Sequence, residues 1–353
     1  MRACLLALAL TGCASWQVVP LPKEAELHRA RTDDGWEISL VRYRAVGEAK
    51  GPPIVLCHGI GANDRNMDLD AQHSMARWFA SQGREAWTMS LRGTGHSDGP
   101  DVDRGRATPI SFDDYWRHDL PSVIAYVQRV SGAAALDYVG HSMGGMVVYA
   151  YLSQGGQGLH AAATLGSPTR LDWGTGMEAV MTTLGPKLVT QKWMIPVRFG
   201  AALVAPVNDA VADGFFERMF YNPLGTDPEA WRRLMVYGTA DVAGGTALQL
   251  ISLMESGRFL SGDGSIDLRA DMAKITTPVM VVAGRLDRVA YTPAVKDGYR
   301  ALGGPREWLL VTRANGARAE YGHMDLVIGE HAADEVWAKV LAFLGSPPAT
   351  AGR

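Results

Sequence analysis

The stretch that most constrains the fold is the heptapeptide Val139-Gly140-His141-Ser142-Met143-Gly144-Gly145. The apolar run at 134–139 suits a short buried strand, and the apolar run at 146–152 suits a buried helix. A serine between small residues at such a junction occupies a sharp, strained turn, and its hydroxyl projects clear of the sheet. The pattern therefore predicts that Ser142 is a nucleophile and that the backbone N–H of Met143 faces a developing oxyanion.

A second match to the same short pattern, G-x-S-x-G, occurs at 95–99, and a short motif can arise by chance in a chain with 40 glycines among 353 residues. Here the surroundings differ. The residues at 91–94 separate this match from the preceding apolar run, and Pro100-Asp101 leads into a loop instead of a helix. We therefore interpret Ser97 as a loop residue.

Strand and helix patterns alternate from about residue 54 to 168, which predicts a mostly parallel, doubly wound α/β sheet. Before this region, the runs at 26–31 and 36–43 flank an Asp-Gly turn and predict a hairpin. Strands resume at 278–284 and 308–311, and a closing helix is expected at 332–344.

The alternation stops between residues 171 and 275, where helix formers dominate and several prolines interrupt them. Asp227-Pro228-Glu229 is a typical helix start. We interpret this block as a helical cap inserted into the sheet domain. The alternative is a set of ordinary crossover helices, although a crossover needs only about a dozen residues. The predicted organisation is a signal peptide with lipobox at 1–13, a first core part at 24–170, the cap at 171–275, a second core part at 276–345 and a tail at 346–353.

The N-terminus carries Met1-Arg2, a short apolar run at 3–10 and then Thr11-Gly12-Cys13. This run is too short to cross a bilayer as a helix, and it is typical of a secretory signal. The residues at 10–13 resemble a bacterial lipobox, which implies a lipid-modified Cys13 and a lipid-anchored protein of the bacterial cell envelope, periplasmic or surface-facing. The alternative is an ordinary signal without acylation. If Cys13 is acylated, Cys57 has no disulfide partner and is expected to be a small buried hydrophobe.

Composition excludes some other classes of function. A net charge of −3 gives no reason to expect a nucleic-acid partner. No metal-ligand cluster is evident, and the glycine-rich Gly93-Thr94-Gly95 lacks the lysine of a phosphate-binding loop. We therefore expect no metal and no cofactor.

Side chains able to perform acyl chemistry follow four of the predicted strands. Because ligands of open α/β sheets bind beyond the carboxyl ends of the strands, these residues should meet at one edge. Their chain order is one of the known orders of a catalytic triad, with Ser142 as nucleophile, Asp287 as acid and His323 as base. His323 would take the serine proton and Asp287 would hold the imidazole tautomer. The backbone N–H groups of Ile60 and Met143 would form the oxyanion hole.

Rival assignments exist for the acid. Asp172 follows the preceding strand, and Asp325 is a more remote candidate. Asp287 could instead be a loop carboxylate paired with Arg285 or Arg288. For the histidines, we expect His58 to shape the loop after its strand, and His96 and His141 to be structural.

Several stretches together resemble the α/β-hydrolase fold superfamily over roughly residues 36–345. They are Leu56-Cys57-His58-Gly59, Leu91-Arg92-Gly93-Thr94-Gly95-His96-Ser97-Asp98, Gly140-His141-Ser142-Met143-Gly144-Gly145 and Ala283-Gly284-Arg285-Leu286-Asp287. The segment at 321–330, with Glu335-Val336-Trp337, is similar to the acid-lipase and polyhydroxyalkanoate-synthase-like branch. Synthases of that branch use a cysteine nucleophile, so Ser142 favours a hydrolase.

The resemblance and the residues together predict a secreted, lipid-anchored serine esterase or lipase. Its partner would be a small-molecule acyl ester, apolar or lipid-like, because the block at 171–275 is rich in methionine and aromatic residues. Two alternatives stay open. An acyltransferase could use the same triad with an alcohol in place of water, and a non-catalytic surface protein could keep the fold as a binding scaffold.

Overall fold

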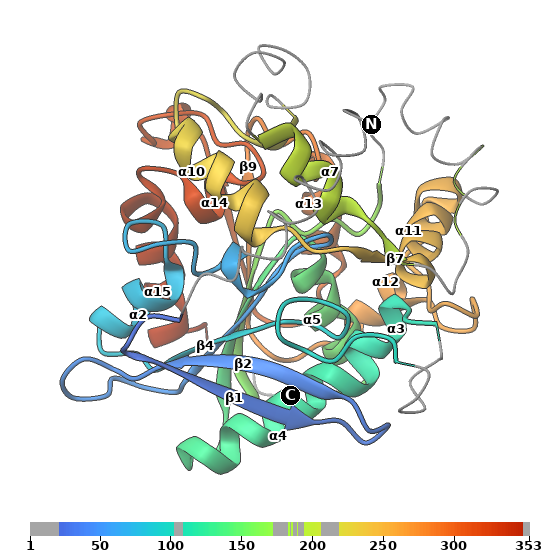
Figure 1. Ribbon diagram of the computed structural model, residues 1–353, viewed down its shortest axis with the longest axis horizontal. Coiled ribbons are helices and arrows are strands. Elements are labelled where there is room, and N and C mark those ends of the chain that lie inside the picture. The colour runs from blue at the N-terminus through green and yellow to red at the C-terminus, as the bar shows by residue number, and fades with distance from the viewer. Residues whose placement is uncertain are drawn as a thin grey trace, which may run out of the picture.

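The computed structural model describes residues 21–101, 109–171, 183, 185, 189, 194–205 and 219–348. Within these ranges, an eight-stranded sheet has the strand order β1-β2-β4-β3-β5-β6-β9-β10 (Figure 1). The signal peptide and lipobox predicted at 1–13 lie outside the described residues.

The sheet begins with the predicted hairpin. Strands β1 (Ala25–Arg31) and β2 (Glu37–Tyr43) pair antiparallel, and the backbone N–H of Thr32 donates to the carbonyl of Trp36 across the turn at 2.8 Å. Strand β2 also pairs antiparallel with β4 (Ala86–Met89). These two antiparallel pairings lie at one edge of the sheet, and the remaining pairings form its parallel part.

Every pairing beyond β4 in this order is parallel, as the strand–helix alternation predicted. The five further strands are β3 (Ile54–Cys57), β5 (Leu136–His141), β6 (Leu159–Leu165), β9 (Val279–Gly284) and β10 (Arg306–Val311). All residues of β3, β5 and β9 are buried, because helices cover both faces. The predicted mostly parallel, doubly wound sheet is confirmed.

Two apolar cores lie on the opposite faces of the sheet, and alternate strand residues supply them. Val55 and Cys57 of β3 belong to one core, whereas Ile54 and Leu56 belong to the other. This alternation follows from the two-residue period of a strand. The first core includes residues of α4 (Leu120–Ser131) and α5 (Met143–Ser153), and the second includes residues of α2 (Met75–Ser81) and α15 (Ala338–Gly345) (Figure 1).

The chain between β6 and β9 is a long insertion, because these two strands pair directly with each other. Its described elements are β7 (Met194–Ile195), α7 (Val197–Val204), α10 (Pro228–Arg233), η4 (Leu234–Gly238), β8 (Val242–Ala243), α11 (Gly244–Ser256), α12 (Leu268–Asp271) and η5 (Met272–Lys274). Helices dominate, as predicted, and β7 pairs antiparallel with β8. The last two elements, α12 and η5, pack on α5 of the core. They therefore contact the sheet domain although they precede residue 275, and the cap boundary at that residue stays a prediction.

The predicted helix start at Asp227 is present, since its side chain accepts from the backbone N–H of Glu229 at 3.0 Å. The helical segment before β5 has three parts: α3 (Phe112–Asp114) and the π-helical turn η2 (Tyr115–Asp119) precede α4, and Pro121 lies in the first turn of α4. The remaining elements are η1 (Asp64–Asn66), α13 (Thr292–Ala301), η6 (Arg313–Asn315), α14 (Asp325–Ile328) and η7 (Ala333–Trp337). No helix in the described ranges has the length and apolarity that crossing a bilayer requires.

Candidate active site

Ser142 lies at the junction of β5 and α5, on a backbone conformation that side chains rarely adopt. Its φ of 54° is the only positive φ of a non-glycine residue in the described ranges. Such a conformation costs about 1–3 kcal/mol and persists where the surroundings fix it. Glycines allow the close packing here. A Cβ on Gly140 would lie 2.5 Å from the carbonyl carbon of Gly144, and a Cβ on Gly144 would lie 2.5 Å from the carbonyl oxygen of Cys57.

The loop after β3 packs directly on this serine. A Cβ on Gly59 would lie 2.9 Å from the Cβ of Ser142 and 3.4 Å from its Oγ, so only glycine fits. The next residue is Ile60. Its backbone N–H and that of Met143 have no hydrogen-bond partner in the described part of the chain. The two predicted oxyanion donors are therefore uncommitted, and they lie in the residues that flank Gly59 and Ser142.

The predicted acid and base contact each other. Nδ1 of His323 lies 2.8 Å from Oδ2 of Asp287, and both side chains are buried. The other carboxylate oxygen, Oδ1, accepts from the backbone N–H of Val289 at 2.9 Å and of Ala290 at 2.7 Å. With both carboxylate oxygens occupied, Asp287 has a fixed orientation. Nδ1–H of the imidazole donates to it, which leaves Nε2 as the proton-accepting nitrogen.

The end of β6 connects the serine to the acid–base pair. The carbonyl of Leu165 accepts from the backbone N–H of Ser142 at 2.8 Å. The next residue is Gly166, where a Cβ would lie 3.0 Å from Oδ2 of Asp287 and 3.1 Å from Nδ1 of His323. One turn thus contacts all three predicted residues. Gly166 was not among the predicted site residues, and the only signal for it in the sequence is the Gly166-Ser167-Pro168 turn that follows the strand.

Two further histidines surround the site, and both have structural contacts. Nε2 of His141 donates to the carbonyl of His323 at 3.2 Å, its Nδ1 lies 3.1 Å from the side chain of Asn66, and burial lowers its pKa well below the usual value. Nδ1 of His58 donates to the carbonyl of Gly59 at 2.7 Å, and its Nε2 accepts from the N–H of Leu91 at 3.1 Å. Burial lowers the pKa of His58 to about 4. Both rings are therefore neutral near pH 7, and they agree with the structural roles predicted for them.

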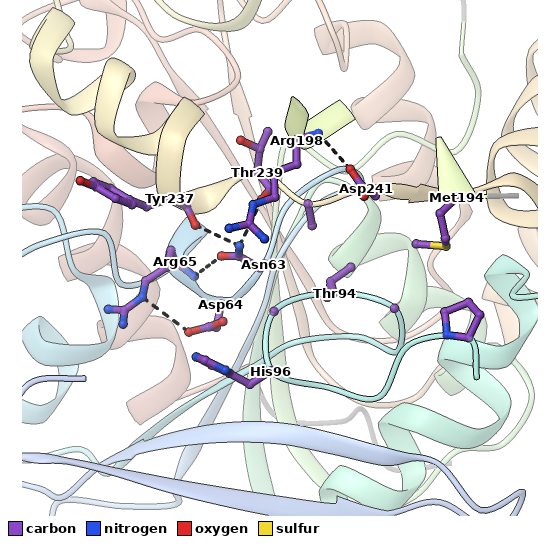
Figure 2. Close-up of a pocket in the computed structure, with 14 residues that line it drawn as sticks. Asn63, Asp64, Arg65, Thr94, His96, Met194, Arg198, Tyr237, Thr239 and Asp241 are labelled. Atoms are coloured by element: carbon purple, nitrogen blue, oxygen red, sulfur yellow. Dashed lines mark hydrogen bonds and ion pairs between the residues drawn. The ribbon is translucent and has the colours of Figure 1, made fainter. Parts of the chain in front are cut away.

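The segment that follows β3 borders a polar cavity of about 350 Å³ (Figure 2). Asn63, Asp64 and Arg65 line one side, and the loop at 93–96 lines another. The insertion supplies the remaining lining residues Met194, Arg198, Tyr237, Thr239, Ala240 and Asp241. His96, which we expected to be structural, is one of the lining residues. Nothing in the sequence around Asp64 indicates that the insertion packs here.

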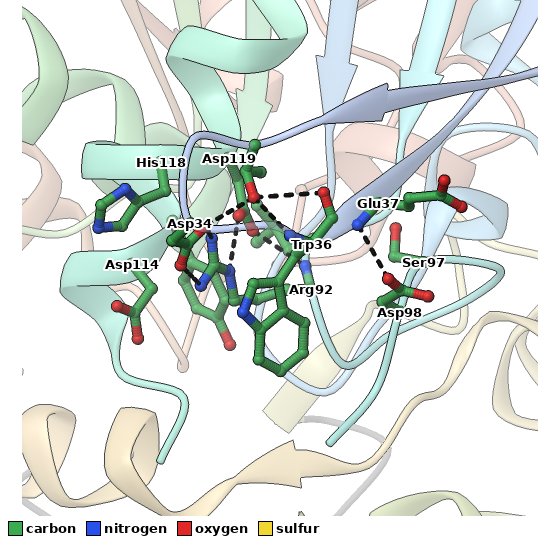
Figure 3. Close-up of polar contacts among 12 residues, drawn as sticks. Asp34, Trp36, Glu37, Arg92, Ser97, Asp98, Asp114, His118 and Asp119 are labelled. Carbon is green, nitrogen blue, oxygen red and sulfur yellow. Dashed lines mark hydrogen bonds and ion pairs between the residues drawn. The ribbon is translucent and has the colours of Figure 1, made fainter. Parts of the chain in front are cut away.

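The second G-x-S-x-G stretch is held by polar contacts (Figure 3). Oγ of Ser97 accepts from the N–H of Ser39 at 2.8 Å and donates to the carbonyl of Ser90 at 2.5 Å. Oδ2 of Asp98 accepts from the N–H of Glu37 at 3.0 Å. These bonds tie the loop to β2, and they leave Ser97 in the loop position that its sequence context predicted.

Arg92, which precedes this stretch, has a structural role. Its guanidinium donates to Asp119 at 2.7 Å and to Asp34 at 2.6 and 3.0 Å, so the ion pairs join the β1–β2 turn to η2 (Figure 3). Burial raises the pKa of Asp119 to about 7. Asp33, Asp34 and His118 place ligand atoms within 4.8 Å of one another near this turn. Asp34 is held by Arg92, and His118 lies 2.7 Å from Asp33, so ion pairing already engages these groups.

Cys57 and the rival acids have other surroundings. The thiol of Cys57 is buried, and burial raises its pKa to about 12, as suits the predicted small hydrophobe. Asp172 lies outside the described residues. Oδ2 of Asp325 accepts from the N–H of Asn222 at 2.9 Å, and its carboxylate also accepts from the Thr226 hydroxyl and the Gly322 N–H.

Asp325 thereby fastens the insertion to the loop that carries His323. The backbone adds further bonds between the two, since the N–H of Met324 donates to the carbonyl of Phe220 at 2.7 Å and the N–H of Glu330 donates to that of Gly225 at 2.9 Å. Asp325 is fully buried, and burial raises its pKa to about 6. The geometry makes Asp325 a positioning residue and gives it a different partner set from that of Asp287.

We expect Asp325→Asn to reveal this titration. Between about pH 4 and pH 6 the folded protein binds the Asp325 proton more tightly than the unfolded chain does. The stability that this group contributes is therefore present below about pH 4 and is lost as pH rises through about 6. The unfolding free energy of the natural protein, relative to that of Asp325→Asn, should fall by up to about 3 kcal/mol over this range. Urea unfolding at pH 4, 5, 6 and 7 measures the difference. The exposed Asp334→Asn is the control, and a pH-independent difference would contradict the assignment.

Comparison with protein families gives a match to a family model described as alpha/beta hydrolase fold, over residues 52–194. Among curated proteins, Lipase 1 of Drosophila melanogaster is 30% identical over 125 residues, which cover 34% of this chain and 28% of that protein. Triacylglycerol lipase 1 of Arabidopsis thaliana is 26% identical over 201 residues, covering 54% of this chain and 51% of the relative. Human lysosomal acid lipase/cholesteryl ester hydrolase is 30% identical, covering 37% and 35%. The chain therefore spans between about a quarter and about half of these relatives.

Solved structures share the fold over most of the chain. An esterase from Exiguobacterium antarcticum has a TM-score of 0.59 at 16% identity, covering 90% of this chain and 99% of that one. The crystal structure of a membrane phospholipase A has a TM-score of 0.57 at 17% identity, covering 98% of each chain. At these identities the likeness establishes the fold.

Proposed function

Because the chain belongs to the α/β-hydrolase fold superfamily, we propose that it is a serine hydrolase that cleaves carboxylic esters through an acyl-enzyme on Ser142. One observation carries the proposal. A strained serine, Ser142, and a buried hydrogen-bonded pair, His323 and Asp287, flank the single turn at Leu165 and Gly166. A nucleophile, a base and a group that orients the base are the parts that acyl transfer requires.

In the proposed mechanism each of these groups has one role. Asp287 fixes the tautomer of His323, so that Nε2 takes the proton of the Ser142 hydroxyl as it attacks the ester carbonyl. The same nitrogen then returns the proton to the leaving alcohol, and water repeats the sequence to release the acid. The uncommitted N–H groups of Ile60 and Met143 would bind the negative oxygen of the tetrahedral intermediate, and each such donor supplies roughly 3 kcal/mol in comparable enzymes.

The relatives support an ester as the substrate, since the curated matches are lipases and the structural matches include esterases. The apolar residues of the insertion have two kinds of surroundings in the described chain. Phe220 stacks on Trp231 with ring centroids 5.7 Å apart, which shows that these two residues pack on each other. Phe199 is half exposed. Much of the segment expected to cover the acyl chain lies outside the described residues.

We expect medium acyl chains to be preferred over acetyl. Each buried methylene contributes roughly 0.8 kcal/mol, so a pocket that takes four more of them gains on the order of 100-fold in kcat/KM if about 3 kcal/mol is realised in the transition state. A panel of p-nitrophenyl esters from acetate to octanoate, at soluble concentrations, measures this dependence. Labelling of Ser142 by a fluorophosphonate probe is the accompanying test of the nucleophile. Equal turnover of acetate and octanoate would remove the apolar-pocket hypothesis, and absence of labelling would favour a non-catalytic scaffold.

We also propose that the mature protein is anchored by lipid at Cys13 in a bacterial cell envelope, on the basis of the lipobox-like residues 10–13. Mass spectrometry of protein made in a bacterial host should find an acylated N-terminal Cys13, and Cys13→Ser should abolish the modification. A single acyl chain gives only marginal membrane affinity, so firm anchoring requires more than one chain. A mature N-terminus at another residue would contradict the proposal.

A further inference from the structure

The ring of His141 packs against the ring of the proposed base. His141 is the last residue of β5 and directly precedes Ser142, so the strand that carries the nucleophile also fixes this ring. The two imidazoles, those of His141 and His323, have centroids 4.5 Å apart and an angle of 44° between their planes. A Cβ on Gly59 would lie 3.5 Å from Nδ1 of His141. His141 therefore contacts the base and borders the loop that packs on the nucleophile.

His141 also holds the backbone of the base. Its Nε2 lies 3.2 Å from the carbonyl oxygen of His323, and a carbonyl can only accept a hydrogen bond. The proton of this bond is therefore on Nε2 of His141. At its ring, His323 is held by Asp287, whose Oδ2 lies 2.8 Å from Nδ1. A carboxylate thus orients the ring of the base, and an imidazole orients its backbone.

The proton on Nε2 determines what the other ring nitrogen of His141 can do. Burial lowers the pKa of His141 well below the usual value, so near pH 7 the ring is neutral and has one N–H. Nδ1 can then only accept, yet it lies 3.1 Å from Oδ1 of Asn66, which is also an acceptor. A hydrogen bond forms when the amide is rotated by 180°, which places its NH₂ group opposite Nδ1. The NH₂ group has no other partner in the described chain, so the rotation breaks no bond there.

Asn66 has a fixed position of its own. It is the last residue of η1 and is 1% exposed, and its backbone N–H donates to the carbonyl of Asn63 at 2.9 Å. Nδ2 of Asn63 donates in turn to the carbonyls of Tyr237 and Thr239. The amide that faces His141 therefore belongs to a turn that is bonded to the insertion.

A neutral ring suits the position of His141. When His323 takes the serine proton it becomes an imidazolium, and a second cation beside it would oppose that charge. The neighbouring His58 is neutral as well, because burial lowers its pKa to about 4. The carboxylates near the base are Asp287, on its ring, and Asp325, on its loop. The charge that stabilises the imidazolium thus comes from these acids, and His141 adds no repulsion.

We propose that His141 is a positioning residue of the base, and that Asn66 selects the tautomer of His141 that makes this possible. His141 donates from Nε2 to the backbone of His323 and keeps the imidazole where it can take the proton of Ser142. The inference rests on the proposed role of His323 as base, and it adds two residues that act through it. Because both act on the base and not on the bound ester, their replacement should lower kcat and leave KM nearly unchanged.

Two substitutions of His141 separate the hydrogen bond from the volume of the ring. His141→Gln keeps an N–H donor near the position of Nε2, whereas His141→Phe keeps a ring of similar size without a donor. A misplacement of about 1 Å can cost about 100-fold in rate, so kcat of His141→Phe for p-nitrophenyl octanoate should fall about 10- to 100-fold. His141→Gln should recover most of this loss, and KM should change by no more than about threefold in both. Urea unfolding gives the folded fraction to which kcat is referred.

Asn66→Asp tests the tautomer with almost no change in shape. A carboxylate can only accept, so Nδ1 of His141 has to donate to it. A neutral ring would then turn a lone pair towards the carbonyl of His323 and lose that bond, and a doubly protonated ring would place a cation beside the base. Both states impair proton transfer, so kcat should fall by about 10-fold or more while KM is kept.

His28→Phe is the matched control. The ring of His28 lies 4.8 Å from that of Trp87, and its Nδ1 lies 3.0 Å from the hydroxyl of Tyr126. His28 thus has the same two kinds of contact on β1, far along the sheet from the site. This variant should lose some stability and keep the kcat of the natural protein, referred to folded enzyme.

The outcomes separate this inference from the proposed function. A natural kcat in His141→Phe would mean that only the volume of the ring matters, and it would overturn the inference. An equal loss in His141→Gln and His141→Phe, or a natural kcat in Asn66→Asp, would overturn it as well. In each of these cases the natural protein still hydrolyses the ester, so the proposed function stands. If the natural protein does not hydrolyse p-nitrophenyl octanoate, the proposed function itself is refuted.

Discussion

Ser142→Ala is expected to lower kcat for ester hydrolysis by on the order of 10⁶-fold, which is the scale seen when a triad serine is removed. Without the hydroxyl, no acyl-enzyme forms, and only the binding site and the oxyanion donors remain to act on water. Alanine also accepts the same backbone region about as well as serine does, so the elbow at φ 54° should persist. Steady-state hydrolysis of p-nitrophenyl octanoate measures the loss, and circular dichroism with thermal unfolding shows that the fold is retained.

Ser97→Ala is the matched control, because it removes a serine from the other G-x-S-x-G stretch. The variant loses the hydroxyl contacts to Ser39 and Ser90, which anchor a loop, and it should keep its activity within a few-fold. If Ser142→Ala retained activity while Ser97→Ala lost it, the nucleophile would be the loop serine and the proposed mechanism would be wrong.

The central strands β3 and β9 were predictable because each is buried on both faces and therefore reads as a continuous apolar run. Ile54–Cys57 and Val279–Gly284 are such runs, and polar or glycine-containing stretches follow both. The elbow was predictable for a different reason. Its two glycines are required by backbone atoms that lie too close for a Cβ, and this requirement appears in the sequence as a fixed spacing around Ser142.

The sequence was less informative wherever long-range packing decides the structure. The π-helical turns at Tyr115–Asp119 and Ala333–Trp337 lie inside stretches with ordinary helical composition. The short pair of strands at Met194–Ile195 and Val242–Ala243 joins segments almost fifty residues apart. The cavity that Asp64 lines depends on the same packing, because its far wall comes from this insertion.

The identity of the proposed acid also depends on long-range packing. Asp325 is two residues from His323 in sequence, whereas Asp287 is 36 residues away. In the described chain, Asp287 is nevertheless the one of the two that hydrogen-bonds to the imidazole. Proximity along the chain was therefore a poor guide. The better guide was position at the end of a buried strand, since parallel strands bring their carboxyl ends to one edge of the sheet.

Asp287→Asn should lower kcat by on the order of 10⁴-fold, as is observed when a triad acid is replaced by its amide. The amide can donate to Nδ1 of His323, and this would stabilise the tautomer whose proton is on Nε2. That nitrogen could then no longer accept the serine proton. The bonds from Val289 and Ala290 to the other side-chain oxygen should hold the loop in place, so the loss would be in kcat and only slightly in stability. Hydrolysis of p-nitrophenyl octanoate across pH measures the effect.

The matched variants are Asp325→Asn and Asp172→Asn, which replace the two rival acids. Asp325 accepts bonds from Thr226, Asn222 and Gly322 that position the His323 loop, so its amide should reduce stability and affect kcat far less than Asp287→Asn does. Asp172→Asn should also have a small effect. A larger loss of kcat in either rival variant than in Asp287→Asn would transfer the role of the acid to that residue, because the group that fixes the histidine tautomer is the one whose amide inactivates the enzyme.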